Sequence, residues 1–269
     1  MKINNLDPSK YNRFFAFGCS FTSYKWLTWA DIIGKDIEVY ENWGEQGGGN
    51  HFIFNSVVEA DARHNFTKND LVIIFWSTKE REDRYLNNKW IHATAGTIES
   101  EYGKEWIDKF YFDTRSFLIR DLAYMKSIQS ILKSRDCDWA NLCWNEFFNN
   151  TSMRETFTKT TNKKSLVKMW RDNCKEVYSG NSIPNFFDDQ DVIQLYQDVF
   201  TNITSVYRWF DEEQNINTTN RLDDHPTPTE ALLFLDWIWP DNTISDSTRQ
   251  YAKQWDCTET IQRLRISRL

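Results

Sequence analysis

The sequence predicts an α/β fold in which a parallel sheet is covered by helices. Up to Trp76, short apolar runs alternate with segments of helical periodicity, which is the pattern of repeated strand–helix–strand units. The run from Asp70 to Trp76, DLVIIFW, is apolar at nearly every position, as expected of a strand that is buried on both faces. The 269 residues contain no internal repeat and no linker, so we expect a single domain.

The first half of the chain is expected to alternate strands and helices. Short apolar runs predict strands at residues 13–17, 37–40 and 70–76, and helical spacing of apolar residues predicts helices at 24–33 and 51–63. The stretch ENWGEQGGGN lies between the second strand and the second helix. Its glycines predict a loop, because they permit backbone turns that other residues avoid.

The second half is expected to add helices, one strand and an insertion. Stripes of apolar residues predict helices at 113–133, 190–210 and 230–238, and a fourth strand is predicted at 139–147. Residues 149–185 are polar and mixed, which indicates inserted structure. We therefore expect a helical insertion at about 86–220 and a charged C-terminal extension at 240–269.

Charge and hydropathy exclude two classes of partner. Lys and Arg total 32 against 39 Asp and Glu, and the net charge of −7 disfavours nucleic acid, whose phosphates need a surplus of positive charge. No run of about 18 apolar residues occurs, so we expect no membrane span. The Asn-, Lys- and Ile-containing composition is compatible with an AT-rich genome, such as that of a phage.

The cysteines and histidines indicate neither a disulfide framework nor a metal site. The 5 Cys form no CxxC pair, which is typical of reduced thiols. The 4 His show no HxxxH or Cys/His spacing, so we expect no metal and no cofactor. The N-terminal segment lacks the apolar stretch of a secretory signal, so we expect a cytoplasmic protein.

One candidate motif lies where the first strand is expected to end. It reads Gly18-Cys19-Ser20-Phe21-Thr22. Ligands of parallel α/β sheets bind beyond the carboxyl ends of the strands, so Ser20 at this point can project into a site. The alternative is that Ser20 only caps the helix that follows.

A second candidate motif precedes the last expected helix. It reads Asp223-Asp224-His225-Pro226-Thr227. A carboxylate beside a histidine can orient the imidazole so that it accepts the proton of a serine. The alternative is a helix-start loop, with acidic caps and a proline in the first turn.

Together, the two motifs resemble the SGNH/GDSL hydrolase family. The family's first block, Gly-Asp-Ser, corresponds to Gly18-Cys19-Ser20, with Cys19 in the place of the Asp. Its last block supplies an acid and a His that is often followed by Pro, as in His225-Pro226. The resemblance implies that Ser20 is the nucleophile and His225 its base. It also implies a flavodoxin-like three-layer α/β/α sandwich with a parallel sheet.

The glycine-rich stretch matches another block of the family. That block supplies a glycine whose amide joins the oxyanion hole. The spacing Asn42-x-Gly44-x-x-Gly47 corresponds to it, so the resemblance implies that Gly47 is the donor. The amide of Ser20 is expected to be a second donor.

The sequence departs from the family at the third oxyanion donor. The family's third block is usually Gly-x-Asn-Asp after the third strand, whereas this strand ends in Trp76-Ser77-Thr78. We expect Asn50 to supply the missing donor, because the glycines before it allow its amide to approach Gly47. The hydroxyl of Thr78 or Ser77 is the alternative, and Asn50 would then be a helix cap.

A second departure concerns the acid of the triad. The family's acid lies three residues before the His, where this chain has Leu222. The nearest acids are Asp223 and Asp224. We favour Asp223, because an offset of two residues lets its side chain fold back toward the ring, and Asp224 is the alternative.

Other residues near this edge of the sheet permit both a structural and a functional interpretation. Cys19 is either a nucleophile or, as we favour, a small apolar side chain. Arg81 and Arg84 either bind an anionic substrate or belong to the exposed start of a helix. The third set consists of tryptophans that either stack on a sugar or pack in the core: Trp26, Trp43 and Trp76.

The resemblance implies a serine hydrolase that cleaves an ester on a glycan or a small molecule. Ser20, His225 and Asp223 would form its triad, and Gly47, Asn50 and Thr78 would bind the oxyanion or the substrate. Two alternatives stay open. One is a non-catalytic module of the same fold that binds glycans or is associated with virions, and the other is an acyltransferase. The oligomeric state is not predicted.

Overall fold

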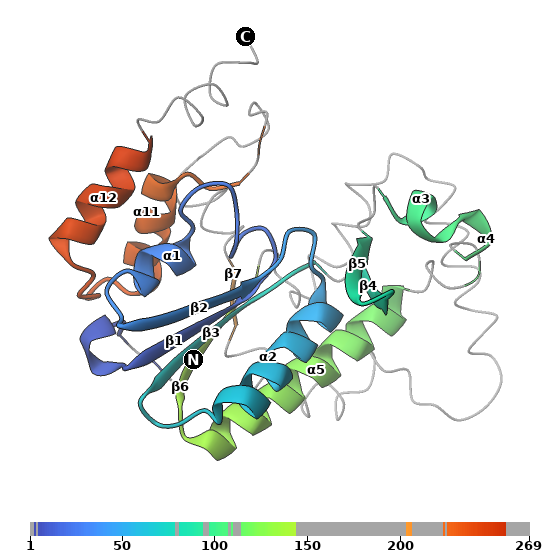
Figure 1. Cartoon of the computed structure of the whole chain (residues 1–269), viewed down its shortest axis with the longest axis horizontal. Helices are drawn as coiled ribbons and strands as arrows, with labels where there is room; N and C mark the ends of the chain where they lie inside the picture. The colour runs from blue at the N-terminus through green and yellow to red at the C-terminus, as the bar shows by residue number, and fades with distance from the viewer. Residues whose placement is uncertain are drawn as a thin grey trace, which may run out of the picture.

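A parallel sheet forms the centre of the protein. The computed structural model describes residues 3, 5–78, 81–93, 97–106, 109, 114–143, 203–205, 223 and 225–256. Within these ranges, a 5-stranded sheet has the order β2-β1-β3-β6-β7, and all of its neighbouring strands are parallel (Figure 1). Its strands are β1 (Arg13–Gly18), β2 (Val39–Gly44), β3 (Asp70–Trp76), β6 (Asp138–Cys143) and β7 (Ile203–Ser205).

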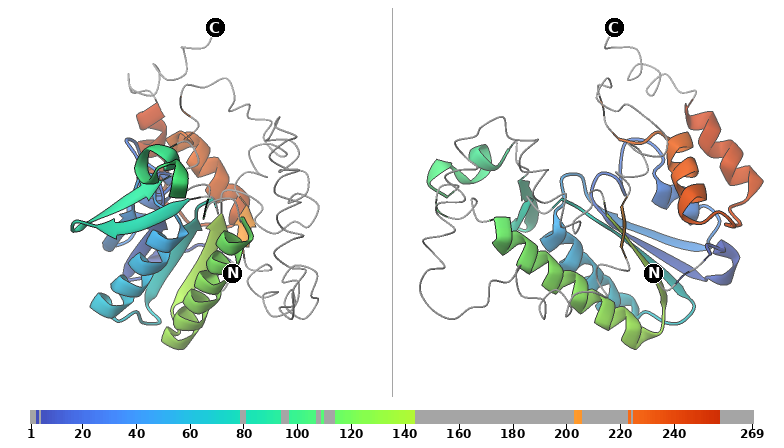
Figure 2. Two further views of the ribbon diagram at one scale, coloured as in Figure 1. Left: turned by 90° about the vertical axis from the view of Figure 1, so that its right-hand side faces the viewer. Right: turned by 180° about the vertical axis from the view of Figure 1, so that it is seen from behind.

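Helices cover both faces of this sheet. One face carries α1 (Trp29–Gly34), α11 (Pro228–Ile238) and α12 (Asp246–Asp256), and the other carries α2 (Asn50–His64) and α5 (Thr114–Arg135). The views in Figures 1 and 2 show the sheet between these two groups. The predicted three-layer α/β/α architecture is thus confirmed, and its strand order is that of flavodoxin-like folds.

Alternating side chains of β1 build the two halves of the core. Phe14 and Ala16 are fully buried with residues of α1 and α11, whereas Phe15 and Phe17 are fully buried with residues of α2 and α5. This alternation is the period of an extended strand. Strand β3 is covered on both faces as well. Each of its seven residues is buried, which explains its nearly continuous apolar pattern.

A separate antiparallel hairpin lies beside the sheet. It consists of β4 (Glu82–Leu86) and β5 (Lys89–Ala93), and it is followed by the short helices α3 (Ile98–Tyr102) and α4 (Lys104–Trp106). The expectation of a helix start around Arg81 and Arg84 is therefore wrong. Asn87 and Asn88 both have positive φ, at 52° and 61°, which is the backbone of a two-residue hairpin turn.

The strands and helices of the first half agree with the prediction in type and differ in their ends. The helix expected at 24–33 begins only at Trp29, because Thr28 and Asp31 form a capping box. The strand expected at 37–40 instead spans Val39–Gly44. A short 3-10 helix, Pro8–Lys10, precedes β1.

One predicted helix is contradicted by a strand. The structure has β7 at Ile203–Ser205, inside the helix expected at 190–210, and the other residues of that range lie outside the described part. Helical spacing of apolar residues misled the prediction, because β-branched side chains such as Ile203 and Thr204 also favour strands. Residues 149–185, which were expected to form inserted structure, also lie outside the described part of the chain.

The expected insertion at about 86–220 includes parts of the core. Helix α5 packs against α2, and β6 pairs with β3 in the central sheet, so these two elements belong to the main layers. The strand expected at 139–147 begins at Asp138, and its described part ends at Cys143. None of the described helices is both long and apolar enough to cross a membrane.

Candidate functional site

The turn after β1 brings Ser20 to the carboxyl edge of the sheet. Cys19 O accepts hydrogen bonds from the amides of Thr22 at 2.9 Å and Ser23 at 3.1 Å, which closes a tight turn around Ser20. A side chain at Gly18 would clash with this turn, because its Cβ would lie 2.1 Å from Thr22 Oγ1. The expected alternative, that Ser20 caps the next helix, is wrong, because Thr28 occupies that cap.

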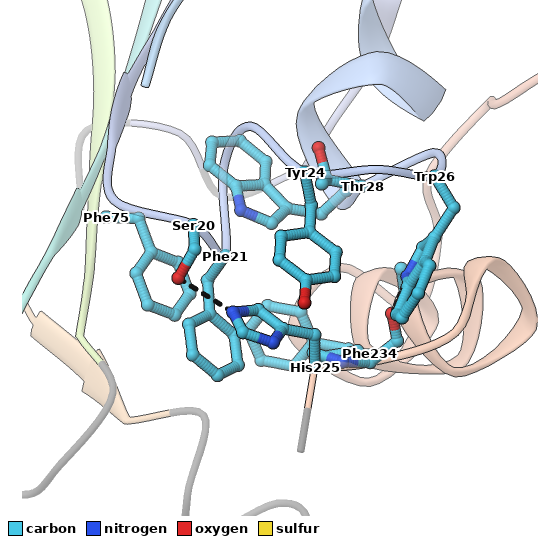
Figure 3. A pocket seen from close by; sticks show the side chains of 11 residues that line it. Ser20, Phe21, Tyr24, Trp26, Thr28, Phe75, His225 and Phe234 are labelled. Atoms are coloured by element: carbon cyan, nitrogen blue, oxygen red, sulfur yellow. Dashed lines mark hydrogen bonds between the residues drawn. The ribbon is translucent and has the colours of Figure 1, made fainter. Parts of the chain in front are cut away.

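Ser20, His225 and Asp223 form a continuous chain of hydrogen bonds. Ser20 Oγ lies 2.7 Å from His225 Nε2, and His225 Nδ1 lies 2.6 Å from Asp223 Oδ1 (Figure 3 shows the first of these contacts). With Nδ1–H donating to the carboxylate, Nε2 of a neutral imidazole accepts from the serine hydroxyl. Asp223 is thus the acid in contact with the ring, whereas Asp224 lies outside the described residues.

The loop before α11 fixes the position of His225. The His225 amide donates to Asp223 Oδ1 at 3.1 Å, so the aspartate binds both the backbone and the ring of the same residue. Pro228 opens α11, and Thr227 and Glu230 form a capping box there. The motif thus leads into a helix start, as the alternative expected, but the cap is Thr227 and not an aspartate, and the proline of the first turn is Pro228 and not Pro226.

The charge of Asp223 is held by its hydrogen bonds. Burial raises the pKa of this carboxyl, but hydrogen bonds from Tyr24 and from His225 outweigh burial and hold its pKa below the ordinary value. The phenol of Tyr24 donates to Asp223 Oδ2. Burial, followed by the neighbouring carboxylate, raises the pKa of Tyr24 above its ordinary value, so this phenol stays protonated as a donor.

A largely aromatic pocket opens beside Ser20 and His225. Trp26 lines it, and its Nε1 donates to Pro226 O at 2.7 Å. Trp76 is fully buried in the core, and Trp43 packs against Phe17, so neither of these lines the pocket. The other lining residues are Ser20, Phe21, Tyr24, Thr28, Trp29, Phe75, His225, Pro226, Ala231 and Phe234 (Figure 3).

Gly47 lies in the turn that follows β2. Its φ of +82° is a backbone conformation that favours glycine. An added Cβ would lie 3.3 Å from the Cβ of His92 on the hairpin, so the turn also packs closely against β5. Since β2 and β1 are neighbours with Gly44 opposite Gly18, both connections leave the same edge of the sheet.

Asn50 does not have a free amide for an oxyanion. Its Nδ2 donates to Ser77 O at 3.1 Å and to Asp121 Oδ2 at 2.6 Å, and its Oδ1 accepts from the amide of Ser77 at 2.8 Å. Both amide hydrogens are therefore used, and the side chain is fully buried. The expected oxyanion role of Asn50 is wrong for this reason. The cap of α2 is Gly49, so Asn50 is not the cap either.

Thr78 remains the candidate for the third donor. It is the second residue after β3 and is half-buried, whereas Ser77, the first, is buried with its amide and carbonyl bound to Asn50. The connection that carries Thr78 follows the strand next to β1, so it leaves the same edge of the sheet as the connection that carries Ser20. Its role stays a prediction.

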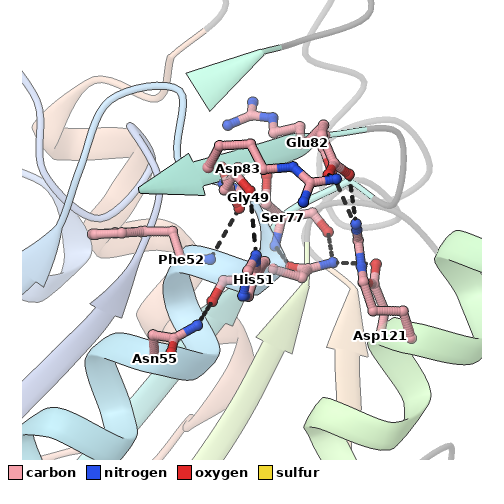
Figure 4. A network of polar contacts seen from close by, with 12 residues as sticks. Gly49, His51, Phe52, Asn55, Ser77, Glu82, Asp83 and Asp121 are labelled. Carbon is pink, nitrogen blue, oxygen red and sulfur yellow. Dashed lines mark hydrogen bonds and ion pairs between the residues drawn. The ribbon is translucent and has the colours of Figure 1, made fainter. Parts of the chain in front are cut away.

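A buried polar network supports the glycine-rich turn from the side of the hairpin (Figure 4). The carboxylate of Asp83 is fully buried and accepts from the amides of Gly49 and Phe52, both at 2.9 Å, at the start of α2. His92 Nδ1 lies 2.8 Å from the same carboxylate. Burial lowers the pKa of His92, but the hydrogen bond and charge of Asp83, with the charge of Glu45, outweigh burial and raise it.

The arginines of this region bind within the protein. Arg81 Nη1 donates to Gly48 O at 3.0 Å, and Arg84 forms an ion pair with Glu82 at 2.8 Å. Arg120 bridges Glu82 and Asp121, at 2.9 Å each. The contacts of Arg81 and Arg84 thus give no support to the interpretation that they bind an anionic substrate.

Tyr24 belongs to neither sequence motif, although it contacts both Asp223 and His225. The available signal is its position shortly after Ser20. This signal is weak, because a tyrosine in such a connection can equally serve in packing. Cys19 is buried at the sheet edge, in agreement with the favoured packing role. Among the described residues, no group of three His, Cys, Asp or Glu side chains is arranged to hold a metal ion.

Comparisons with known proteins find similarity in fold. No protein-family model matches the chain. No curated protein matches it either. One similar solved structure is a member of the lipolytic protein G-D-S-L family from Veillonella parvula DSM 2008, at 12% identity and a TM-score of 0.40, covering 83% of this chain and 93% of that chain. Another is a catalytic mutant of an acetylxylan esterase from Geobacillus stearothermophilus, at 11% identity and a TM-score of 0.43, covering 88% of this chain and 96% of that chain. The solved structures that resemble this chain thus include a G-D-S-L lipolytic protein and an acetylxylan esterase.

Proposed function

We propose that the protein is a serine hydrolase that cleaves an ester through Ser20, His225 and Asp223. The single observation that carries the proposal is the chain of hydrogen bonds, at 2.7 Å and 2.6 Å, that links the three side chains. A serine, a histidine and an aspartate in this arrangement form the constellation that activates a hydroxyl for attack on a carbonyl. Its position at the carboxyl ends of the strands is where α/β sheets bind their ligands.

The acylation step follows from this arrangement. Ser20 Oγ forms a bond with the carbonyl carbon of the ester while its proton passes to His225 Nε2, and the carbonyl oxygen becomes an oxyanion. Asp223 stabilises the imidazolium through Nδ1–H and stays ionised. The tetrahedral intermediate then collapses, the ester C–O bond breaks, and the leaving alkoxide takes the proton from His225. Ser20 is left as an acyl ester.

Deacylation repeats these proton transfers with water. His225 takes a proton from water while the water oxygen attacks the acyl carbon. The bond between that carbon and Ser20 Oγ then breaks, and His225 returns the proton to Ser20 Oγ as the carboxylic acid leaves. An alcohol in place of water would make the same residues an acyltransferase. Hydrolysis and transfer differ only in the acceptor.

We assign the oxyanion hole to the amides of Ser20 and Gly47, with the hydroxyl of Thr78 as the third donor. The positive φ of Gly47 and its place beside β1 support its assignment. Two or three donors aimed at the developing charge account for a large share of catalysis in acyl transfer.

The pocket beside Ser20 supports a substrate with a small apolar acyl group. Phe21, Phe75 and Phe234 contribute aromatic walls, and the Thr28 hydroxyl is already bound to Thr22 O at 2.7 Å. The alcohol part of the ester is a glycan or a small molecule in this proposal. Trp26 is the tryptophan available for stacking at the pocket.

A non-catalytic binding module is the second candidate. It is favoured by one observation, namely that the amide of Asn50 is bound to Asp121 and Ser77 and cannot replace the missing oxyanion donor. The two candidates are separated by a panel of p-nitrophenyl esters of increasing acyl length, measured on the wild type and on Ser20→Ala. Turnover that is lost in Ser20→Ala supports the hydrolase, and its absence in a folded wild type supports the binding module.

A further inference from the structure

Tyr24 contacts two of the three residues of the proposed triad. Its hydroxyl donates a hydrogen bond to Asp223 Oδ2, and its ring stacks on the imidazole of His225, with centroids 3.8 Å apart and planes at 12°. Figure 3 shows the Tyr24 side chain directed toward His225 from the connection between β1 and α1. Tyr24 therefore lies on the same connection as Ser20 and contacts both His225 and Asp223, the other two residues of the proposed triad.

The two carboxylate oxygens of Asp223 have different partners. Oδ1 accepts from Nδ1 and the backbone amide of His225, whereas Oδ2 accepts from Tyr24. Because Asp223 lies only two residues before His225, its side chain has to turn back along its own loop to reach the ring. A donor on the other oxygen holds the carboxylate in this orientation.

The segment that carries Tyr24 holds the histidine loop at a second point. Trp26 Nε1 donates to Pro226 O at 2.7 Å, and the rings of Tyr24 and Trp26 meet edge to face, with centroids 4.6 Å apart. The two hydrogen bonds from this segment therefore reach the loop before and after His225 in the sequence. Such outer contacts fix the orientation of a functional imidazole.

We propose that Tyr24 is a positioning residue that fixes the orientation of the Asp223–His225 pair. The inference rests on the proposed function, because it concerns the same triad. Without the hydroxyl, Asp223 Oδ2 loses its donor, the carboxylate turns away for part of the time, and His225 loses its acceptor. Without the ring, the imidazole also loses the closer of two stacking partners, because the other ring, that of Phe21, has its centroid 4.8 Å away.

The surroundings of Asp223 make this effect measurable. Burial raises the pKa of Asp223, and the hydrogen bonds from Tyr24 and His225 lower it to below the ordinary value. In the described ranges, the titratable side chains that face this carboxylate are those of Tyr24 and His225, and Lys25 Nζ lies 5.6 Å from the centroid of the Tyr24 ring. Removal of the Tyr24 hydroxyl therefore raises the pKa of Asp223.

Three variants separate the contributions of the hydroxyl and the ring. Tyr24→Phe removes the hydroxyl alone, and Tyr24→Leu removes both. Tyr11→Phe is the matched control, because Tyr11 also donates to an aspartate, Asp138, at 3.0 Å, but it lies before β1 at the opposite edge of the sheet.

The experiment measures kcat and KM with p-nitrophenyl acetate, the pKa of the Asp223 carboxyl by carbon NMR, and thermal stability. For Tyr24→Phe we expect a kcat about 10-fold lower at unchanged KM, because the carboxylate loses a charge-assisted hydrogen bond, together with a raised Asp223 pKa. We expect a lower kcat still for Tyr24→Leu, and wild-type kcat for Tyr11→Phe.

Two results would overturn the proposal. One is an unchanged kcat and an unchanged Asp223 pKa in Tyr24→Phe. The other is an equal loss of kcat in Tyr24→Phe and Tyr11→Phe, which would indicate a general loss of stability. A wild type without turnover would instead refute the proposed function. The Asp223 pKa in Tyr24→Phe would then decide by itself whether Tyr24 controls the carboxylate.

Discussion

Ser20 and His225 are 205 positions apart in the sequence, and Ser20 Oγ lies 2.7 Å from His225 Nε2. Strand β1 ends just before the serine, and the loop before α11 carries the imidazole. Since β1 lies between β2 and β3 and α11 packs against α1, the fold itself brings the two side chains to one edge of the sheet.

Asp223→Asn is expected to lower ester turnover by about 10⁴-fold, because an amide cannot stabilise the imidazolium as a carboxylate does. The contact between Asp223 Oδ1 and His225 Nδ1, at 2.6 Å, is the basis of this prediction. Steady-state kinetics with p-nitrophenyl acetate measure it. Asp224→Asn is the control, with turnover near that of the wild type. A larger loss of turnover in Asp224→Asn than in Asp223→Asn would show that Asp224, and not Asp223, is the acid of the triad.

Gly47→Ala is expected to lower turnover about 10-fold or more, because the oxyanion turn has to shift. An added Cβ would lie 3.3 Å from His92 Cβ, at a φ of +82°. Gly103→Ala provides the matched control, since Gly103 has a φ of +81° and nothing within 4 Å of its added Cβ. Both variants carry backbone strain of roughly 1–3 kcal/mol, so thermal melts should show a loss of stability in each. Equal turnover in the two variants would show that Gly47 is not part of the oxyanion hole.

Asn50→Ala and Thr78→Val are expected to have opposite effects. Loss of the Asn50 amide leaves Ser77 and Asp121 with buried, unsatisfied groups, which costs about 3 kcal/mol of stability, while turnover per folded molecule is retained. Thr78→Val removes the proposed third donor and is expected to lower turnover about 10²-fold with little change in stability. Denaturant unfolding and kinetics on both variants measure the contrast. Full turnover in Thr78→Val would leave the third donor unassigned.

Asp121 is expected to make stability depend on pH. Burial raises its pKa to about 7, and the contacts with Arg120 and Asn50 offset only part of this rise. Between roughly pH 4, where an unfolded aspartate titrates, and about pH 7, the folded state keeps a proton that the unfolded state has lost. The free energy of unfolding therefore decreases as pH rises through this window.

The variant Asp121→Asn is expected to flatten this part of the profile, as measured by urea unfolding between pH 4 and pH 7. The comparison with the wild type isolates Asp121, because other groups such as His92 titrate in both proteins. Identical slopes in the two proteins would show that Asp121 is ionised throughout the range.

Local patterns in the sequence were sufficient to predict the central strands. The run DLVIIFW predicts a strand at 70–76, and β3 spans Asp70–Trp76, because a strand covered on both faces is apolar at nearly every position. The preference for Asp223 over Asp224 also rested on local geometry, and Asp223 is the one that contacts His225. Its catalytic role remains a proposal.

Contacts between distant segments could not be predicted in this way. Asn50 was expected in the oxyanion hole, but its amide binds Asp121, 71 positions away on α5. Tyr24 has no motif of its own, since its partner Asp223 is 199 positions away. The strand β7 lies inside a segment of helical periodicity, and its pairing with β6 decides its structure. In each case a tertiary contact overrides or adds to the local signal.

The most direct test of the central claim is covalent labelling with a fluorophosphonate probe, followed by mass spectrometry of the labelled peptide. The account predicts labelling of the wild type at Ser20, no labelling of Ser20→Ala, and strongly slowed labelling of His225→Ala, with all three proteins folded by circular dichroism. A folded wild type that does not react with the probe, or that is labelled equally in Ser20→Ala, would contradict the assignment of Ser20 as an activated nucleophile.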